Sequence, residues 1–182
     1  AMNKPNVMIK VPATNAGYIA MKALTSVGIP VNATLIFKKE QALQCAAAFK
    51  EGTEAFGQKV DTVISVFVSR VDRALDALLE KHNIPTSLTG IYNSANIYEA
   101  VEAMNVKGCR TLFASTGVKG DALATHYYIE NLLAFNSVNT APVETILAFK
   151  KNGKKEKKLP ISSEIIDAHF AKLSAIGVDL EV

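Results

Sequence analysis

The chain has 182 residues, 49% of them apolar, and a formal net charge of +3 at pH 7. That length and apolar content are enough for one globular domain with a sizeable core. Six of the 20 basic residues fall in one run, Lys150 to Lys158, which we interpret as a solvated linker, with a phosphate-rich partner as the alternative. Because much of the positive charge lies in this linker, we expect no nucleic-acid partner. No apolar run reaches the length of a membrane span and no signal segment is recognised, so we expect no membrane partner.

Short apolar runs alternate with longer stretches of helical periodicity along the chain. The expected strands are, in chain order, Val7–Pro12, Val31–Phe37, Thr62–Arg70, Cys109–Ser115 and Asn136–Pro142. A helix is expected after each strand, the first one capped by Thr14, and a last helix follows the basic run. Five βα units and a tail helix predict an α/β fold with a parallel sheet.

The cysteines and histidines show no metal-type spacing. We interpret Cys45 and Cys109 as small buried residues of a protein in a reducing compartment, the cytoplasm. His82, His126 and His169 lie far apart on helical patterns, and we expect them at the surface or at helix ends. The sequence therefore predicts neither a metal site nor a bound cofactor.

Two arrangements of the sheet compete, an open doubly wound sheet and part of a (β/α)8 TIM barrel. The turn after the first strand lacks the glycine-rich phosphate fingerprint that is usual in the open sheet. Single polar residues recur on the strands or at their C-terminal ends, at Lys10, Asn32, Thr34, Ser65, Arg70, Ser115 and Asn139. In a barrel, such residues converge on one cavity, so this pattern favours the barrel.

Lys10 and Arg70 are the residues whose placement points to chemistry. Burial disfavours the charged form of a lysine, and the neutral amine is a nucleophile that condenses with a ketone to a Schiff base. The alternative is a lysine that reaches solvent or pairs with a carboxylate. Arg70 at the end of a strand suits a phosphate, or else a salt bridge to an acid of the next helix. The glycine-rich turn at residues 115–120 precedes a helix, where Lys119 would add charge to an anion site.

The segment VMIKVPATNAGYIAM resembles the Schiff-base lysine signature of the transaldolase family. Lys10 takes the position of the lysine, followed in register by Pro12, Thr14 and Gly17, while Tyr18 departs from the usual aliphatic residue. The segments GIPVNATLIF, SVFVSRVD, LFASTGVKGD and SVNTAP are similar to later strands of the family. The resemblance therefore covers essentially the whole chain.

The resemblance implies a class I aldolase without a metal that transfers a dihydroxyacetone unit between sugar phosphates of the pentose phosphate pathway. Its substrates would be of the class of fructose 6-phosphate, erythrose 4-phosphate and sedoheptulose 7-phosphate. It implies that Lys10 forms the Schiff base, and that Thr34 acts in catalysis by orienting substrate hydroxyls and the catalytic water. The implied substrate-binding residues are Asn32, Ser65, Phe67, Arg70 for the phosphate, Ser115 and Lys119. Some family members place an arginine near Lys119, and this chain has none there.

Family members carry about three strands before the lysine strand, with Asp, Asn and Glu site residues that are absent here. We expect residues 1–149 to form strands four to eight of the barrel, and residues 150–182 to form a basic linker and a helix packed on it. The open edges predict association with a second copy or with the missing barrel portion, impaired activity of the chain alone, and an exposed Lys10. The alternatives are another class I aldolase and a non-catalytic half-barrel that self-associates.

Overall fold

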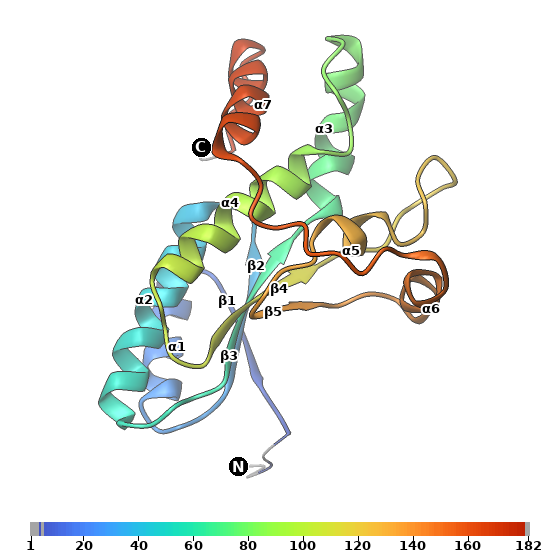
Figure 1. The fold of residues 1–182 in the computed structure, drawn as a ribbon. Helices are drawn as coiled ribbons and strands as arrows, with labels where there is room; N and C mark the ends of the chain where they lie inside the picture. Colours follow the sequence, from blue (N-terminus) through green and yellow to red (C-terminus); the bar gives the residue numbers. More distant parts are fainter. Residues whose placement is uncertain (1–3, 5, 181–182) are drawn as a thin grey trace.

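The computed structural model describes residue 4 and residues 6–180. Five strands form one parallel sheet in the order β1-β2-β3-β4-β5 (Figure 1): β1 (Ile9–Pro12), β2 (Val31–Ile36), β3 (Thr62–Phe67), β4 (Cys109–Ala114) and β5 (Ser137–Asn139). The helices in this part of the chain are α1 (Asn15–Thr25), α2 (Lys39–Phe56), α3 (Ser69–Lys81), α4 (Thr89–Ala103), α5 (Tyr127–Asn131), α6 (Val143–Asn152) and α7 (Ser163–Ala175).

The topology confirms the predicted α/β fold with a parallel sheet. Each strand is followed by at least one helix, and consecutive strands are always neighbours in the sheet. A doubly wound sheet reverses its strand order at one point, and this sheet does not. The arrangement is therefore consistent with part of a (β/α)8 barrel.

The third strand is shorter than its sequence suggested. β3 ends at Phe67 and α3 begins at Ser69, so Arg70 lies in the first turn of a helix and the prediction that it ends a strand is wrong. The β-branched residues of this segment favour a strand, but Ser69 and Asp72 are residue types that favour the start of a helix. Arg70 still lies at the C-terminal end of the sheet, because β3 leads almost directly into α3.

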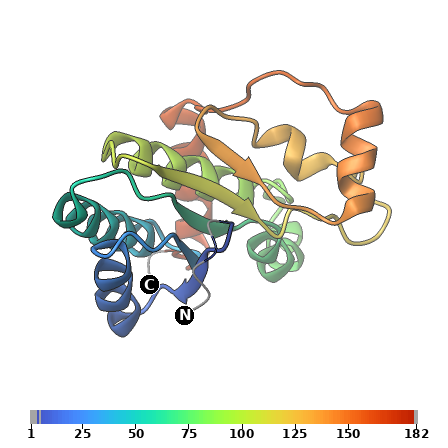
Figure 2. The same ribbon diagram turned by 90° about the horizontal axis from the view of Figure 1, so that it is seen from below.

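The main core lies between one face of the sheet and helices α1, α2 and α4, which gather on that face (Figure 2). Its strand residues are Val11, Val31, Ala33, Ile36, Ile64, Val66 and Cys109, and its helix residues include Met21, Cys45, Phe49 and Ile97. Both cysteines are free and buried, as predicted. Because side chains alternate along a strand, residues of the other parity, beginning with Lys10, face away from these helices.

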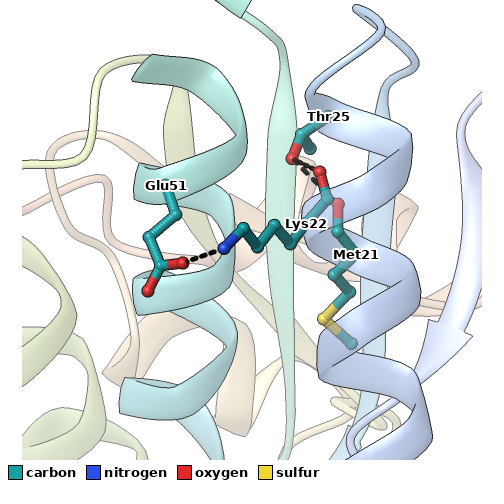
Figure 3. Close-up of polar contacts among 4 residues, drawn as sticks. All are labelled: Met21, Lys22, Thr25 and Glu51. Atoms are coloured by element: carbon teal, nitrogen blue, oxygen red, sulfur yellow. Dashed lines mark hydrogen bonds and ion pairs between the residues drawn. The ribbon is translucent and has the colours of Figure 1, made fainter. Parts of the chain in front are cut away.

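Helices α1 and α2 pack closely against each other outside the sheet (Figure 3). The Lys22 ammonium pairs with the Glu51 carboxylate at 2.6 Å, and the Thr25 hydroxyl donates to the Met21 carbonyl oxygen at 2.8 Å. The close approach depends on Gly52, because a methyl group there would collide with the Thr25 hydroxyl and lie 2.7 Å from the Lys22 carbonyl oxygen. The two helices thereby form a tight outer layer behind β1 and β2.

The basic run begins in the last turn of α6, with Lys150 and Lys151, and its remainder follows a defined path toward α7. The Lys154 amide donates to the Glu130 carboxylate at 3.1 Å, and the Lys158 amide donates to the Leu133 carbonyl oxygen at 2.8 Å. Leu159 is 1% exposed and anchors the end of the run in the core that α5 and α7 share. Helix α7 then packs against α4. Over residues 6–180, no helix combines the length and the apolar character that crossing a membrane requires.

His169 does not lie where its helical pattern suggested. It is 5% exposed, and its Nε2 lies 2.8 Å from the Thr89 hydroxyl at the start of α4. Burial, with a smaller contribution from Lys172, lowers the pKa of His169. The expected surface position is therefore wrong, because α7 turns this face toward α4. His82 and His126 do lie at helix ends, as predicted.

Candidate active site

Polar side chains of three neighbouring strands lie together on the sheet face that points away from α1 and α2. Lys10 of β1 is in register with Asn32 of β2, and Pro12 is in register with Thr34. The Ser65 hydroxyl of β3 donates to the Asn32 carboxamide oxygen at 2.7 Å. Asn32 is in register with Val63 of β3, and Ser65 lies two residues further on the same side, so Lys10, Asn32 and Ser65 form one polar row.

Lys10 is exposed, which agrees with its position on an edge strand. Within residues 6–180 it forms no ion pair with a carboxylate. Thr34 is 7% exposed and precedes a bulge, at which Leu35 adopts a positive φ of 62°. A bulge bends its strand and turns the neighbouring side chains, and no sequence pattern indicated this one.

Arg70 is held over an aromatic ring. Its guanidinium carbon lies 4.6 Å from the centre of the Phe67 ring, within the range of a cation–π contact. Phe67 in turn packs against Phe37 with 5.3 Å between ring centres. Among the described residues no acid of α3 pairs with Arg70, so the salt-bridge alternative has no support. The stacked guanidinium keeps its N–H groups available for a ligand.

A hollow of about 490 Å³ lies at the C-terminal ends of β3, β4 and β5, and we call it the basic hollow. Its lining residues are Ser69, Arg70, Arg73, Ser115, Thr116, Gly117, Lys119, Thr140, Ala141 and Pro142. The hydroxyl oxygens of Ser69 and Ser115 lie 3.0 Å apart. The structure thus brings Arg70, Ser115 and Lys119 together, while the polar row and Thr34 lie outside the lining of the hollow.

Seven of the ten lining residues of the basic hollow were not predicted as site residues, and Arg73 and Ser69 are the two that matter most for its chemistry. Arg73 lies one helical turn after Arg70 on α3, and Ser69 contacts Ser115. Arg73 could have been predicted from the sequence, because it lies three residues after Arg70 and residues three apart on a helix share a face. No pattern indicated Ser69, because its role depends on where β4 ends.

A buried acid anchors the helix that carries these arginines. Asp72 is 1% exposed, and its carboxylate accepts hydrogen bonds from the Gly90 amide at 2.6 Å and the Tyr128 hydroxyl at 2.8 Å. Burial raises the pKa of Asp72 to about 6, although both hydrogen bonds oppose the rise. Its charge also contributes to raising the pKa of Tyr128, for which burial is the main cause. Asp72 therefore joins α3 to α4 and α5.

The geometry suits a phosphorylated carbonyl compound. An exposed amine on an edge strand lies beside carboxamide and hydroxyl groups, and a hollow with three cationic residues lies at the strand ends. In residues 6–180, no three His, Cys, Asp or Glu side chains are grouped so that they could hold a metal ion.

Comparison with known proteins agrees with this geometry. The family profile described as Transaldolase/Fructose-6-phosphate aldolase matches residues 1–182. The chain belongs to this family.

Two bacterial transaldolases are similar to this chain. A transaldolase of Campylobacter jejuni is 45% identical over 88% of this chain and 51% of that protein. A transaldolase of Helicobacter pylori is 41% identical over 99% of this chain and 55% of that protein. The chain therefore spans about half the length of the curated relatives it matches.

Proposed function

We propose that this chain carries the Schiff-base lysine and the phosphate-binding wall of a transaldolase. The observation that supports this most is the polar row of Lys10, Asn32 and Ser65 together with a hollow at the C-terminal ends of the strands whose lining, among the described residues, has three cationic side chains and no acid. The substrates would be sugar phosphates of the fructose 6-phosphate, erythrose 4-phosphate and sedoheptulose 7-phosphate class. Family membership supports this choice.

The reaction begins at the Lys10 amine. The Nζ atom attacks the C2 carbonyl carbon of a ketose phosphate, and loss of water leaves an iminium. When the C4 hydroxyl gives its proton to the water that Thr34 orients, the C3–C4 bond breaks, its electron pair enters the iminium to form an enamine, and an aldose phosphate leaves. The same water returns the proton to the new hydroxyl in the addition that follows. The enamine then adds to the aldehyde of a second aldose phosphate, and water releases the product from Lys10.

The other residues of the site bind the substrate and orient it and the water. Asn32 and Ser65 hold the substrate hydroxyls, Thr34 orients the water, and Phe67 and Arg70 form the wall that faces the phosphate, with Ser115 and Lys119 beside them. The support is their position on the open face and around the basic hollow. A place in the pentose phosphate pathway and in the cytoplasm belongs to the same proposal, and the two free, buried cysteines are typical of a reducing compartment.

We further propose that the site works fully only when further βα units pair with the edges of the sheet. Within the described chain, β1 and β5 each have a neighbouring strand on one side only. Lys10 lies on one of these edges, so its amine lacks neighbours that would orient and desolvate it. The chain alone should therefore form the imine slowly.

Borohydride trapping tests the Lys10 assignment. The chain is incubated with fructose 6-phosphate, reduced with sodium borohydride and mapped by peptide mass spectrometry, both alone and mixed with the part of the Campylobacter jejuni relative that it does not match. We expect the adduct on Lys10, more of it in the mixture, and none on the Lys10→Met variant. Lys50→Met, at an exposed position on α2, is the control and should keep the adduct. Absence of a Lys10 adduct from both samples would overturn the assignment.

A further inference from the structure

The basic hollow has an excess of positive charge that a single arginine does not explain. Its lining contains Arg70, Arg73 and Lys119 but no Asp or Glu. None of the three forms an ion pair among the described residues. A concave surface that carries charge of one sign concentrates ligands of the other sign.

Arg73 reaches this hollow from the same helical face as Arg70. The two arginines are three residues apart near the start of α3, which places them about one turn from each other. The Nε of Arg73 donates to the Ser69 carbonyl oxygen at 3.4 Å, a long hydrogen bond that anchors the base of the guanidinium. This hydrogen bond leaves both terminal NH₂ groups of Arg73 unused. Those groups can donate hydrogen bonds to two oxygens of one anion.

We propose that Arg73 is a second guanidinium ligand of the substrate phosphate and makes the hollow selective for the phosphate dianion. The proposal rests on the phosphate site of the proposed function and deepens it. Arg70, stacked on Phe67, would hold the phosphate from one side, and Arg73 would hold it from the next turn of α3. Two guanidinium groups and the Lys119 ammonium match a doubly charged group better than a singly charged one.

Arginine modification tests this on the chain as it exists. The chain contains three arginines, Arg70, Arg73 and Arg110, and Arg110 lies on β4 outside the hollow. The protein is treated with phenylglyoxal in the presence of fructose 6-phosphate, fructose or neither, and the modification rate of each arginine is read by peptide mass spectrometry. We expect fructose 6-phosphate, and not fructose, to slow modification of Arg70 and Arg73 together and to leave Arg110 unchanged.

A matched pair of variants measures the contribution of Arg73. Arg73→Gln and Lys81→Gln remove the same charge from the two ends of α3, and only Arg73 lines the hollow. Inorganic phosphate is titrated while the thermal midpoint is followed. Loss of one charge-assisted hydrogen-bonding group should raise the half-maximal phosphate concentration roughly 10-fold in Arg73→Gln and leave it unchanged in Lys81→Gln. The half-maximal phosphate concentration of Arg73→Lys should fall between those of Arg73→Gln and the parent chain. Lysine restores the positive charge but cannot donate two parallel hydrogen bonds as a guanidinium group does.

The outcomes separate this inference from the function on which it rests. Protection of Arg70 but not Arg73, or equal phosphate binding by Arg73→Gln and Lys81→Gln, would overturn the role of Arg73 and leave the phosphate site in place. Protection of neither arginine would overturn both the role of Arg73 and the phosphate site. Imine formation at Lys10 is measured separately with unphosphorylated dihydroxyacetone, which does not need the hollow, so its failure would count against the proposed reaction instead.

Discussion

Replacing Asp72 by Asn should stabilise the protein at neutral pH and leave its stability nearly unchanged in acid. Burial raises the pKa of Asp72 to about 6 from an ordinary value of 3.8, so the folded state disfavours the ionised carboxylate. An acid with a raised pKa contributes its stability below the unfolded pKa and loses it as pH rises through the folded pKa. A rise of about two units corresponds to roughly 3 kcal/mol between pH 3.8 and pH 7.

The Asp72→Asn variant reproduces the hydrogen bonds that the protonated parent side chain can form. The new carboxamide oxygen can accept from the Gly90 amide, and the new NH₂ group can donate to the Tyr128 hydroxyl oxygen, which reverses the direction of the bond that Tyr128 makes to the carboxylate. The variant should therefore behave like the protonated parent side chain at every pH and avoid the ionisation penalty. We expect its free energy of unfolding to exceed that of the parent chain by up to about 3 kcal/mol at pH 7.5, and the difference to vanish near pH 4.

Urea unfolding between pH 4 and pH 8, followed by circular dichroism, measures this difference. Asp76→Asn is the control, because Asp76 lies one turn later on α3, is partly exposed and accepts from the Ser87 amide at 2.9 Å. The lowered pKa of His169 also makes stability depend on pH, but this residue is present in every variant, so its contribution cancels in the difference. A difference that stays constant with pH would refute the view that Asp72 is buried as an unfavourable charge.

Two further changes test the packing and the polar row. Gly52→Ala should lower the free energy of unfolding by about 1–3 kcal/mol, because the new methyl group collides with Thr25, and adding Thr25→Ala should restore part of the loss in denaturant unfolding. A cost equal to that of Gly57→Ala, at an open position with a φ of 76°, would contradict this explanation. Ser65→Ala should leave stability within about 1 kcal/mol and slow borohydride trapping at Lys10, because Asn32 loses the donor at 2.7 Å that orients it. An unchanged trapping rate would mean that this hydrogen bond does not position Asn32.

The element order was predictable because local patterns and the global fold agree. Thr14 was expected to cap the first helix, and its hydroxyl accepts from the Gly17 amide at 3.1 Å. Asn32 and Ser65 were among the polar strand residues expected to converge on one cavity, and the hydrogen bond between them shows that they meet. Period-two patterns are reliable where one face of a strand packs on a core, as here.

The predictions failed where the local structure is decided by contacts between residues that lie far apart in the sequence. The end of β3 could not be predicted, because the β-branched residues after Phe67 suit a strand as well as the start of a helix. The burial of His169 depends on the Thr89 hydroxyl, 80 residues away in the chain. The bulge at Leu35 likewise depends on how β2 pairs with β3, which no pattern within β2 alone records.

The two halves of the candidate site differ in how much they depend on this chain alone. Every lining residue of the basic hollow comes from segments that follow β3, β4 and β5, and these strands pair with one another in the structure. Lys10 instead lies on β1, which in the described part of the chain pairs with β2 alone. Phosphate binding should therefore persist in the chain by itself, whereas imine formation should depend on what pairs with the free side of β1. If the unmatched part of the Campylobacter jejuni relative accelerated trapping at Lys10 without changing the phosphate affinity, the two functions would be separable as this arrangement predicts.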